Sequence, residues 1–193
     1  MKYLMDNSNI PKARQIPMAL SPEDCDYEAF KRLADIKSNI VDFVESGKNL
    51  YICSHTVGNG KTSWSLKLML KYFDEVWAGN GFVPRGVMVH VPTFLLKCKD
   101  FKNDDSDFSE LCKKVLDVDL VIWDDIAGSN MSSYDYSQLL MYLDAREFKG
   151  LSNIFTSNVT ERGDLEKSVS GKLASRIWNS NTEIIEFKGG ERR

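Results

Sequence analysis

The chain has 193 residues, of which 42% are apolar and 27% charged, with a formal net charge of −3 at pH 7. This length and composition are typical of one globular α/β domain and exclude a disordered chain. Because the net charge is negative, a sequence-independent grip on nucleic acid would have to come from a local basic patch. The sequence has no run of about 18 apolar residues and starts without the apolar segment of a signal peptide, so we expect no membrane contact.

The four cysteines lie far apart in the chain, form no C-x-x-C pair and are accompanied by only two histidines. This spacing does not favour a structural zinc site. We therefore expect reduced thiols in a cytoplasmic protein.

The first part of the chain divides into an arm and the start of a larger domain. Residues 1–26 carry three prolines and little periodicity, which predicts an irregular amino-terminal arm packing on the core. From Tyr27 to Val44 the apolar residues follow a helical spacing, and Ser46-Gly47 is a typical end for that helix. We assign residues 27–193 to one α/β ATPase domain, on the grounds given below.

A candidate phosphate-binding loop lies between a buried strand that begins at Asn49 and an amphipathic helix that reaches Phe73. Two glycines allow backbone N–H groups to point at phosphate oxygens, and the helix directs its positive amino-terminal end at the same anion. The lysine can reach the β- and γ-phosphates, and the following threonine can hold Mg²⁺. The loop comprises His55, Thr56, Val57, Gly58, Asn59, Gly60, Lys61, Thr62 and Ser63.

This loop departs from the pattern G-x-x-x-x-G-K-[ST] at one position, because His55 stands where the first glycine belongs. A short Gly-Asn-Gly-Lys-Thr sequence also occurs in ordinary turns, so a plain strand–turn–helix is the alternative.

A second informative stretch begins at Leu120 and reads as a strand buried on both faces, as in a parallel sheet. It ends in Asp124 and Asp125, and ligands of open α/β sheets bind at such carboxyl ends. In a nucleotide site Asp124 would position Mg²⁺ through its water shell, and Asp125 would polarise the attacking water. Two aspartates can also simply begin a turn, but downstream of a phosphate-binding loop the two signals support each other.

The remaining chain alternates strands and helices, which predicts a parallel sheet with helices on both sides. We expect strands over 87–91, 151–157 and 182–187, and helices over 108–116, 136–143 and 164–178. Asn158, after the second of these strands, either orients the lytic water or caps a turn. Arg176 lies off the apolar stripe of the last helix and should face solvent or a partner.

Seven short sequences occur in an order known from one family: Gly-Lys-Asn-Leu-Tyr-Ile before Gly-Asn-Gly-Lys-Thr, then Val-Pro-Thr-Phe-Leu, Trp-Asp-Asp-Ile, Phe-Thr-Ser-Asn, Leu-Ala-Ser-Arg-Ile and Glu-Phe-Lys-Gly. From about Ile10 to Arg193 the chain resembles the AAA+ core of bacterial and phage helicase loaders of the DnaC/DnaI type. It is also similar to the related IstB-type transposition ATPases.

The resemblance implies a P-loop NTPase of AAA+ type, with a parallel five-stranded sheet and no carboxyl-terminal lid domain. It implies ATP and Mg²⁺ bound at the boundary between subunits of a homo-oligomer, and slow hydrolysis. Asn158 would be sensor 1, and Arg176 the arginine finger that reaches a neighbouring subunit's γ-phosphate. The implied partner is a DnaB-type replicative helicase on single-stranded DNA, and the implied origin is a phage or prophage.

Three departures from the family leave alternatives open. They are His55 in the loop, Ala-Gly-Ser where Gly-Ala-Glu usually follows Asp-Asp-Ile, and the short stretch of about fifty residues where loaders usually carry a helicase-binding domain. One alternative is an IstB-like ATPase that acts on duplex DNA. Another is a nucleotide-occupancy switch that binds a protein partner with little turnover.

We expect single-stranded DNA to contact a segment that interleaves aromatic and basic residues, because stacking and phosphate contacts hold single strands without sequence reading. A solvated helix face with core phenylalanines explains the same pattern. The segment contains Phe94, Lys97, Lys99, Phe101 and Lys102.

Overall fold

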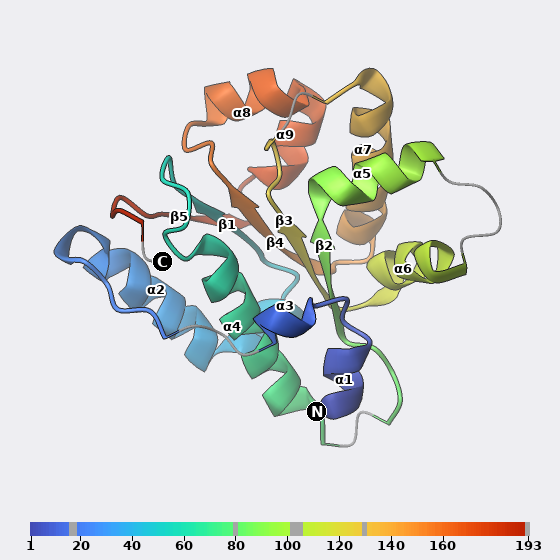
Figure 1. Cartoon of the computed structure of the whole chain (residues 1–193), viewed down its shortest axis with the longest axis horizontal. Coiled ribbons are helices and arrows are strands. Elements are labelled where there is room, and N and C mark those ends of the chain that lie inside the picture. The colour runs from blue at the N-terminus through green and yellow to red at the C-terminus, as the bar shows by residue number, and fades with distance from the viewer. Residues whose placement is uncertain (16–18, 79–80, 101–105, 129–130, 192–193) are drawn as a thin grey trace.

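Five parallel strands form one sheet in the order β2-β3-β4-β1-β5 (Figure 1). This confirms the predicted parallel five-stranded sheet. The computed structural model describes residues 1–15, 19–78, 81–100, 106–128 and 131–191. The strands are β1 (Asn49–Cys53), β2 (Gly86–His90), β3 (Leu120–Asp124), β4 (Ser152–Ser157) and β5 (Thr182–Glu186).

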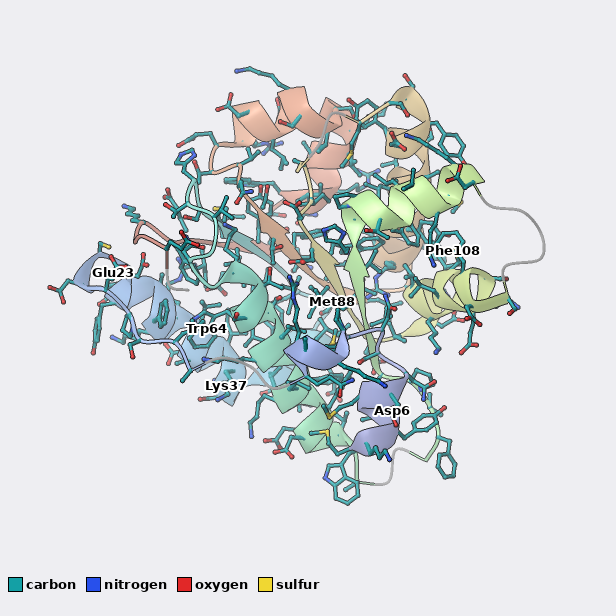
Figure 2. The ribbon with its side chains drawn as sticks, in the orientation of Figure 1. Asp6, Glu23, Lys37, Trp64, Met88 and Phe108 are labelled. Atoms are coloured by element: carbon teal, nitrogen blue, oxygen red, sulfur yellow. The ribbon has the colours of Figure 1, made fainter. Side chains whose placement is uncertain are left out.

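Helices cover both faces of the sheet and bury two apolar clusters against it. Helices α1 to α4 pack on one face and α5 to α9 on the other, and Trp64 and Phe108, labelled in Figure 2, belong to the first and second cluster respectively. The helices are α1 (Lys2–Asp6), α2 (Tyr27–Ser38), α3 (Ile40–Glu45), α4 (Lys61–Val76), α5 (Val91–Asp100), α6 (Ser106–Asp117), α7 (Ser133–Phe148), α8 (Arg162–Val169) and α9 (Gly171–Ile177), with 3-10 turns η1 (Lys12–Arg14) and η2 (Asp24–Asp26).

The side chains of successive strand residues pack into the apolar clusters on opposite faces of the sheet, which explains the continuous apolar runs in the sequence. In β1, Leu50 and Ile52 join the cluster under α4, while Tyr51 and Cys53 join the cluster under α8 and α9. Both faces of the strand are thus buried, as in other parallel sheets with helices on each side.

Two helices predicted as continuous are each divided in two. The helix expected over 27–44 breaks at Asn39, between α2 and α3, and the helix expected over 164–178 breaks at Ser170. Ser170 has φ 81°, outside helical geometry, and its hydroxyl accepts a hydrogen bond from the amide of Leu173 at the start of α9. The apolar stripe of that segment still faces the core, because both short helices pack on the same layer.

The amino-terminal arm is less irregular than the sequence predicts. It contains α1, η1 and η2, and Leu4 and Ile10 are buried in the first cluster. The amide of Met88 in β2 donates to the carbonyl of Ser8 at 2.8 Å, and Asn9 Nδ2 donates to the carbonyl of Met88 at 2.8 Å. The arm thus covers the free edge of β2, while a boundary between arm and domain at residue 26 stays a prediction.

The order of the strands brings three loops together at one edge of the sheet. Strands β3, β4 and β1 are neighbours, and the loops at their carboxyl ends carry Asp125, Asn158 and the glycine loop. This edge is where ligands bind in open α/β sheets. Among the described residues, no helix is both long enough and apolar enough to cross a bilayer.

Candidate nucleotide site

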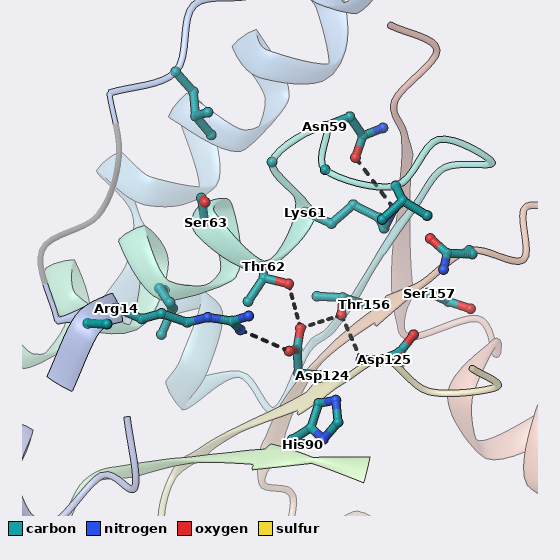
Figure 3. Close-up of a pocket in the computed structure, with 17 residues that line it drawn as sticks. Arg14, Asn59, Lys61, Thr62, Ser63, His90, Asp124, Asp125, Thr156 and Ser157 are labelled. Atoms are coloured by element: carbon teal, nitrogen blue, oxygen red, sulfur yellow. Dashed lines mark hydrogen bonds and ion pairs between the residues drawn. The ribbon is translucent and has the colours of Figure 1, made fainter. Parts of the chain in front are cut away.

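A pocket of about 380 Å³ opens between the glycine loop and the ends of β3 and β4 (Figure 3). The predicted residues Val57 to Ser63, Asp124, Asp125 and Asn158 line it, whereas His55 and Thr56 do not. The pocket also contains residues that the sequence did not single out, namely Ala13, Arg14, Leu20, Leu66, His90, Thr156 and Ser157.

The glycine loop has the backbone conformation that its glycines predict. Gly58 and Gly60 have φ values of 77° and 102°, in the region that side-chain-bearing residues avoid. Leu20 of the arm packs directly on Gly60, where an added Cβ would lie 2.8 Å from its Cδ1 atom. The arm therefore covers the loop at Gly60, where Leu20 leaves no room for a side chain.

Lys61 lies inside the curve of the loop. Its Nζ donates to the carbonyl of Thr56 at 2.9 Å and, at 3.4 Å, to the carbonyl of Ser54. Burial lowers the pKa of Lys61, while nearby negative charges, Asp125 and Asp124 among them, oppose that shift. A bound anion would offset the same burial cost, which is the electrostatic setting expected for a phosphate-binding lysine.

Two buried polar residues, Ser54 and Asn59, stabilise the glycine loop through hydrogen bonds. The Ser54 hydroxyl accepts hydrogen bonds from the amide of Thr56 at 3.1 Å and from the side chain of Asn59, which is fully buried. Sequence reasoning did not identify the role of Ser54, because the pattern of a phosphate-binding loop does not specify its inner hydrogen bonds.

Asp124 connects the loop to the sheet. Its Oδ1 atom accepts a hydrogen bond from Thr62 Oγ1 at 2.7 Å and another from Thr156 Oγ1 at 2.8 Å, and the residue is only 4% exposed. The structure thus brings together the two residues proposed to hold Mg²⁺. Their hydroxyl and carboxylate oxygens are the hard donors that Mg²⁺ prefers, so the donor set fits the ion.

Asp125 is held at the pocket by an unusual backbone conformation. It has φ 60°, and its amide donates to Thr156 Oγ1 at 3.0 Å. Its carboxylate lies over Gly128, where an added Cβ would stand 2.4 Å from Oδ2. Ala127, in place of the glycine usual in the similar loaders, also has a positive φ of 66°. Such strain is concentrated at functional sites and here directs one carboxylate into the pocket.

His55 contacts the other side of the site. Its Nε2 atom lies 2.7 Å from Thr160 Oγ1, so the residue joins the glycine loop to the segment that follows β4. Asn158 lies on this same segment, is exposed and lines the pocket. The substitution of the usual glycine therefore adds a link between two loops, rather than a side chain in the pocket lining.

Arg176 lies outside the pocket of its own chain. Its Nε atom pairs with Asp144 Oδ1 at 2.6 Å and with Glu147 Oε2 at 3.0 Å, and its side chain is 39% exposed. Both acidic partners are on α7, which packs beside α9. The residue is therefore accessible to a neighbouring molecule and oriented by two carboxylates.

The predicted single-strand patch is wrong in one respect. Phe94 is 2% exposed and packs in the core against Phe108 and Tyr142, so it offers no stacking surface. Lys99 pairs with Asp135 at 2.9 Å, while Lys97 lies over the Phe108 ring. Phe101 and Lys102 lie outside the described residues. The alternative of a helix face above core phenylalanines describes this segment better.

No protein-family model and no curated protein matches the chain. Solved structures do match. The crystal structure of the DnaC helicase loader aligns with 97% of this chain and 100% of its own, with a TM-score of 0.73 and 15% identity. The chain has the same fold as the DnaC helicase loader. A primosome component from Streptococcus pyogenes, described as putative, aligns over 100% of this chain and 99% of its own (TM-score 0.71, 22% identity), and DnaI over 93% and 95% (TM-score 0.70, 18% identity).

The DnaC-type fold also occurs in larger replication proteins. AMPPCP-bound DnaA from Aquifex aeolicus aligns with 86% of this chain and 48% of its own, with a TM-score of 0.63 and 17% identity. The chain thus spans about half of that initiator, and the alignment carries the fold alone.

Proposed function

We propose that this protein is a Mg²⁺-dependent ATPase that assists the loading of a DnaB-type helicase on single-stranded DNA during replication in the cytoplasm. The hydrogen bond of 2.7 Å between Thr62 and Asp124 carries the nucleotide part of this proposal, because it joins the glycine loop to the carboxyl end of β3. The replication part rests on the fold shared with DnaC and DnaI.

We assign each of these pocket residues a separate role in phosphoryl transfer. Lys61 and the amides of the glycine loop bind the phosphates, and Thr62 and Asp124 hold Mg²⁺. Mg²⁺ held there would neutralise phosphate charge. Asp125 orients and polarises the attacking water, and Asn158 aligns it from the opposite loop. Catalysis then consists of positioning and charge stabilisation.

Arg176 completes the site from a neighbouring copy of the chain. A guanidinium that contacts the transferred phosphoryl group stabilises charge only when it comes within hydrogen-bond reach, and Arg176 does not line the pocket of its own chain. We therefore propose a homo-oligomer in which each pocket receives the Arg176 of the next subunit. Asp144 and Glu147 orient the side chain for that contact.

Replacing Arg176 with alanine is expected to leave ATP affinity within about twofold and to lower turnover about tenfold, the loss of one charge-assisted contact in the transition state. Binding is measured with a fluorescent nucleotide and turnover by phosphate release. Lys172→Ala, on the same helix and exposed, is the matched control and should keep its turnover. Normal turnover in the Arg176 variant would remove this residue from the mechanism.

One observation favours the occupancy switch as a second candidate. Asp144 and Glu147 already hold Arg176 within its own chain, so if these pairs persist in the oligomer, each pocket would bind ATP without receiving the guanidinium that hydrolysis requires. Intact binding with undetectable turnover at every protein concentration would support this candidate. An IstB-like activity would show instead as stimulation by duplex rather than single-stranded DNA.

A further inference from the structure

Arg14 of the amino-terminal arm reaches into the nucleotide pocket and pairs with Asp124. The Nη1 atom of Arg14 lies 3.3 Å from Asp124 Oδ2, as Figure 3 shows. The other oxygen of this nearly buried carboxylate already accepts hydrogen bonds from two hydroxyls, those of Thr62 and Thr156. Arg14 therefore places a positive charge directly against the carboxylate that we assign to Mg²⁺.

The fold positions Arg14 at this place. The backbone pairing of Ser8 with Met88 fixes the arm to β2, two residues before His90, which is the register partner of Asp124. Burial of Ile10 then anchors the chain, and the amide of Arg14 donates to the carbonyl of Pro11 at 2.8 Å to close a 3-10 turn. Arg14 thus extends from an anchored turn, and its position does not depend on a long unattached segment.

We propose that Arg14 competes with Mg²⁺ for Asp124 and so sets the Mg²⁺ concentration at which the site fills. This inference rests on the proposed function. Two cations close to one carboxylate repel each other, and solvent weakens that repulsion here because the Arg14 side chain is 50% exposed. Arg14 must therefore leave Oδ2, or share it at a cost, when the metal-bound nucleotide enters.

The experiment measures metal binding rather than catalysis. The probe is a fluorescent N-methylanthraniloyl-ADP, whose affinity is determined first with EDTA and then during a Mg²⁺ titration. In Arg14→Ala the Mg²⁺ midpoint should fall about threefold, which is in the range measured for partly exposed ion pairs. The affinity without Mg²⁺ should stay equal to that of the parent protein. Lys12→Ala, in the same exposed turn and also one charge lower, should keep the parent midpoint.

Each outcome decides between distinct accounts. An unchanged Mg²⁺ midpoint in Arg14→Ala, or an equal fall of the midpoint in Lys12→Ala, would overturn the proposal that Arg14 competes with Mg²⁺. Weaker binding in EDTA would also overturn it, because Arg14 would then be a phosphate contact. If the parent protein fails to bind the probe under any condition, the proposed nucleotide function fails, and this inference with it. Arg14→Gln, which keeps much of the side-chain volume, repeats the test if the alanine variant is unstable.

Discussion

Replacing Arg146 with alanine is expected to lower the free energy of unfolding by about 4 kcal/mol, because it removes a buried guanidinium that donates to five acceptors and leaves a cavity. Arg146 lies on α7 and is fully buried. Burial lowers its pKa to about 9, so it stays charged at neutral pH. Its guanidinium donates to Asn153 Oδ1 and to the carbonyls of Val115, Val118, Asp119 and Ser152.

These acceptors come from three different parts of the chain, so Arg146 fastens α7 to the end of α6 and to the starts of β3 and β4. Alanine would take one donor away from each of these acceptors and open a cavity in the core. Thermal unfolding should therefore shift down by about 10 °C for a chain of this size.

Arg162→Ala is the matched control for this prediction. Arg162 pairs with Glu166 on the surface of α8 and is half exposed, so its loss should cost less than about 0.5 kcal/mol. A loss below about 1 kcal/mol in the Arg146 variant would contradict the assigned network, because a fully buried guanidinium cannot be removed at surface cost.

Replacing Lys61 with alanine is expected to weaken ATP binding about 100-fold, which corresponds to the loss of one strong charge-assisted contact. The ammonium is held by the carbonyls of Thr56 and Ser54, inside the curve where phosphates would bind. Arg14 also lines the described pocket, but it pairs with Asp124 and not with the glycine loop, so it does not replace the contacts of Lys61.

Fluorescent nucleotide titration measures this loss, and thermal unfolding of the same samples shows whether the fold is kept. Lys71→Ala is the control, since Lys71 lies on the same helix and pairs with Glu75 away from the pocket. Its affinity should equal that of the parent protein. Unchanged binding in Lys61→Ala would show that the glycine loop does not hold the phosphates.

The sheet and the core of the site could be predicted from sequence because their signals are local. The apolar runs of β1 and β3 identify strands buried on both faces. The glycines of the loop and the two aspartates after β3 are short motifs whose spacing requires no knowledge of packing. Their proximity follows from parallel strands that end at one edge of the sheet.

The rest of the site depends on contacts between residues far apart in the chain. Arg14 meets Asp124 across 110 positions, and Thr156 meets it across 32, so no local pattern reveals either. The position of Phe94 in the sequence fits both a core residue and an exposed stacking residue, and only the fold shows that its side chain is buried. The break at Ser170 had a local signal in its Ser-Gly pair, but the apolar spacing of four across it predicted one helix.

The most direct test of the account is ATP turnover per molecule as a function of protein concentration, with and without single-stranded DNA. A site completed by Arg176 of a neighbouring subunit predicts that specific activity rises with concentration and rises further when single-stranded DNA is added. A measurable specific activity that is independent of concentration would contradict the account, because each molecule would then hydrolyse ATP alone.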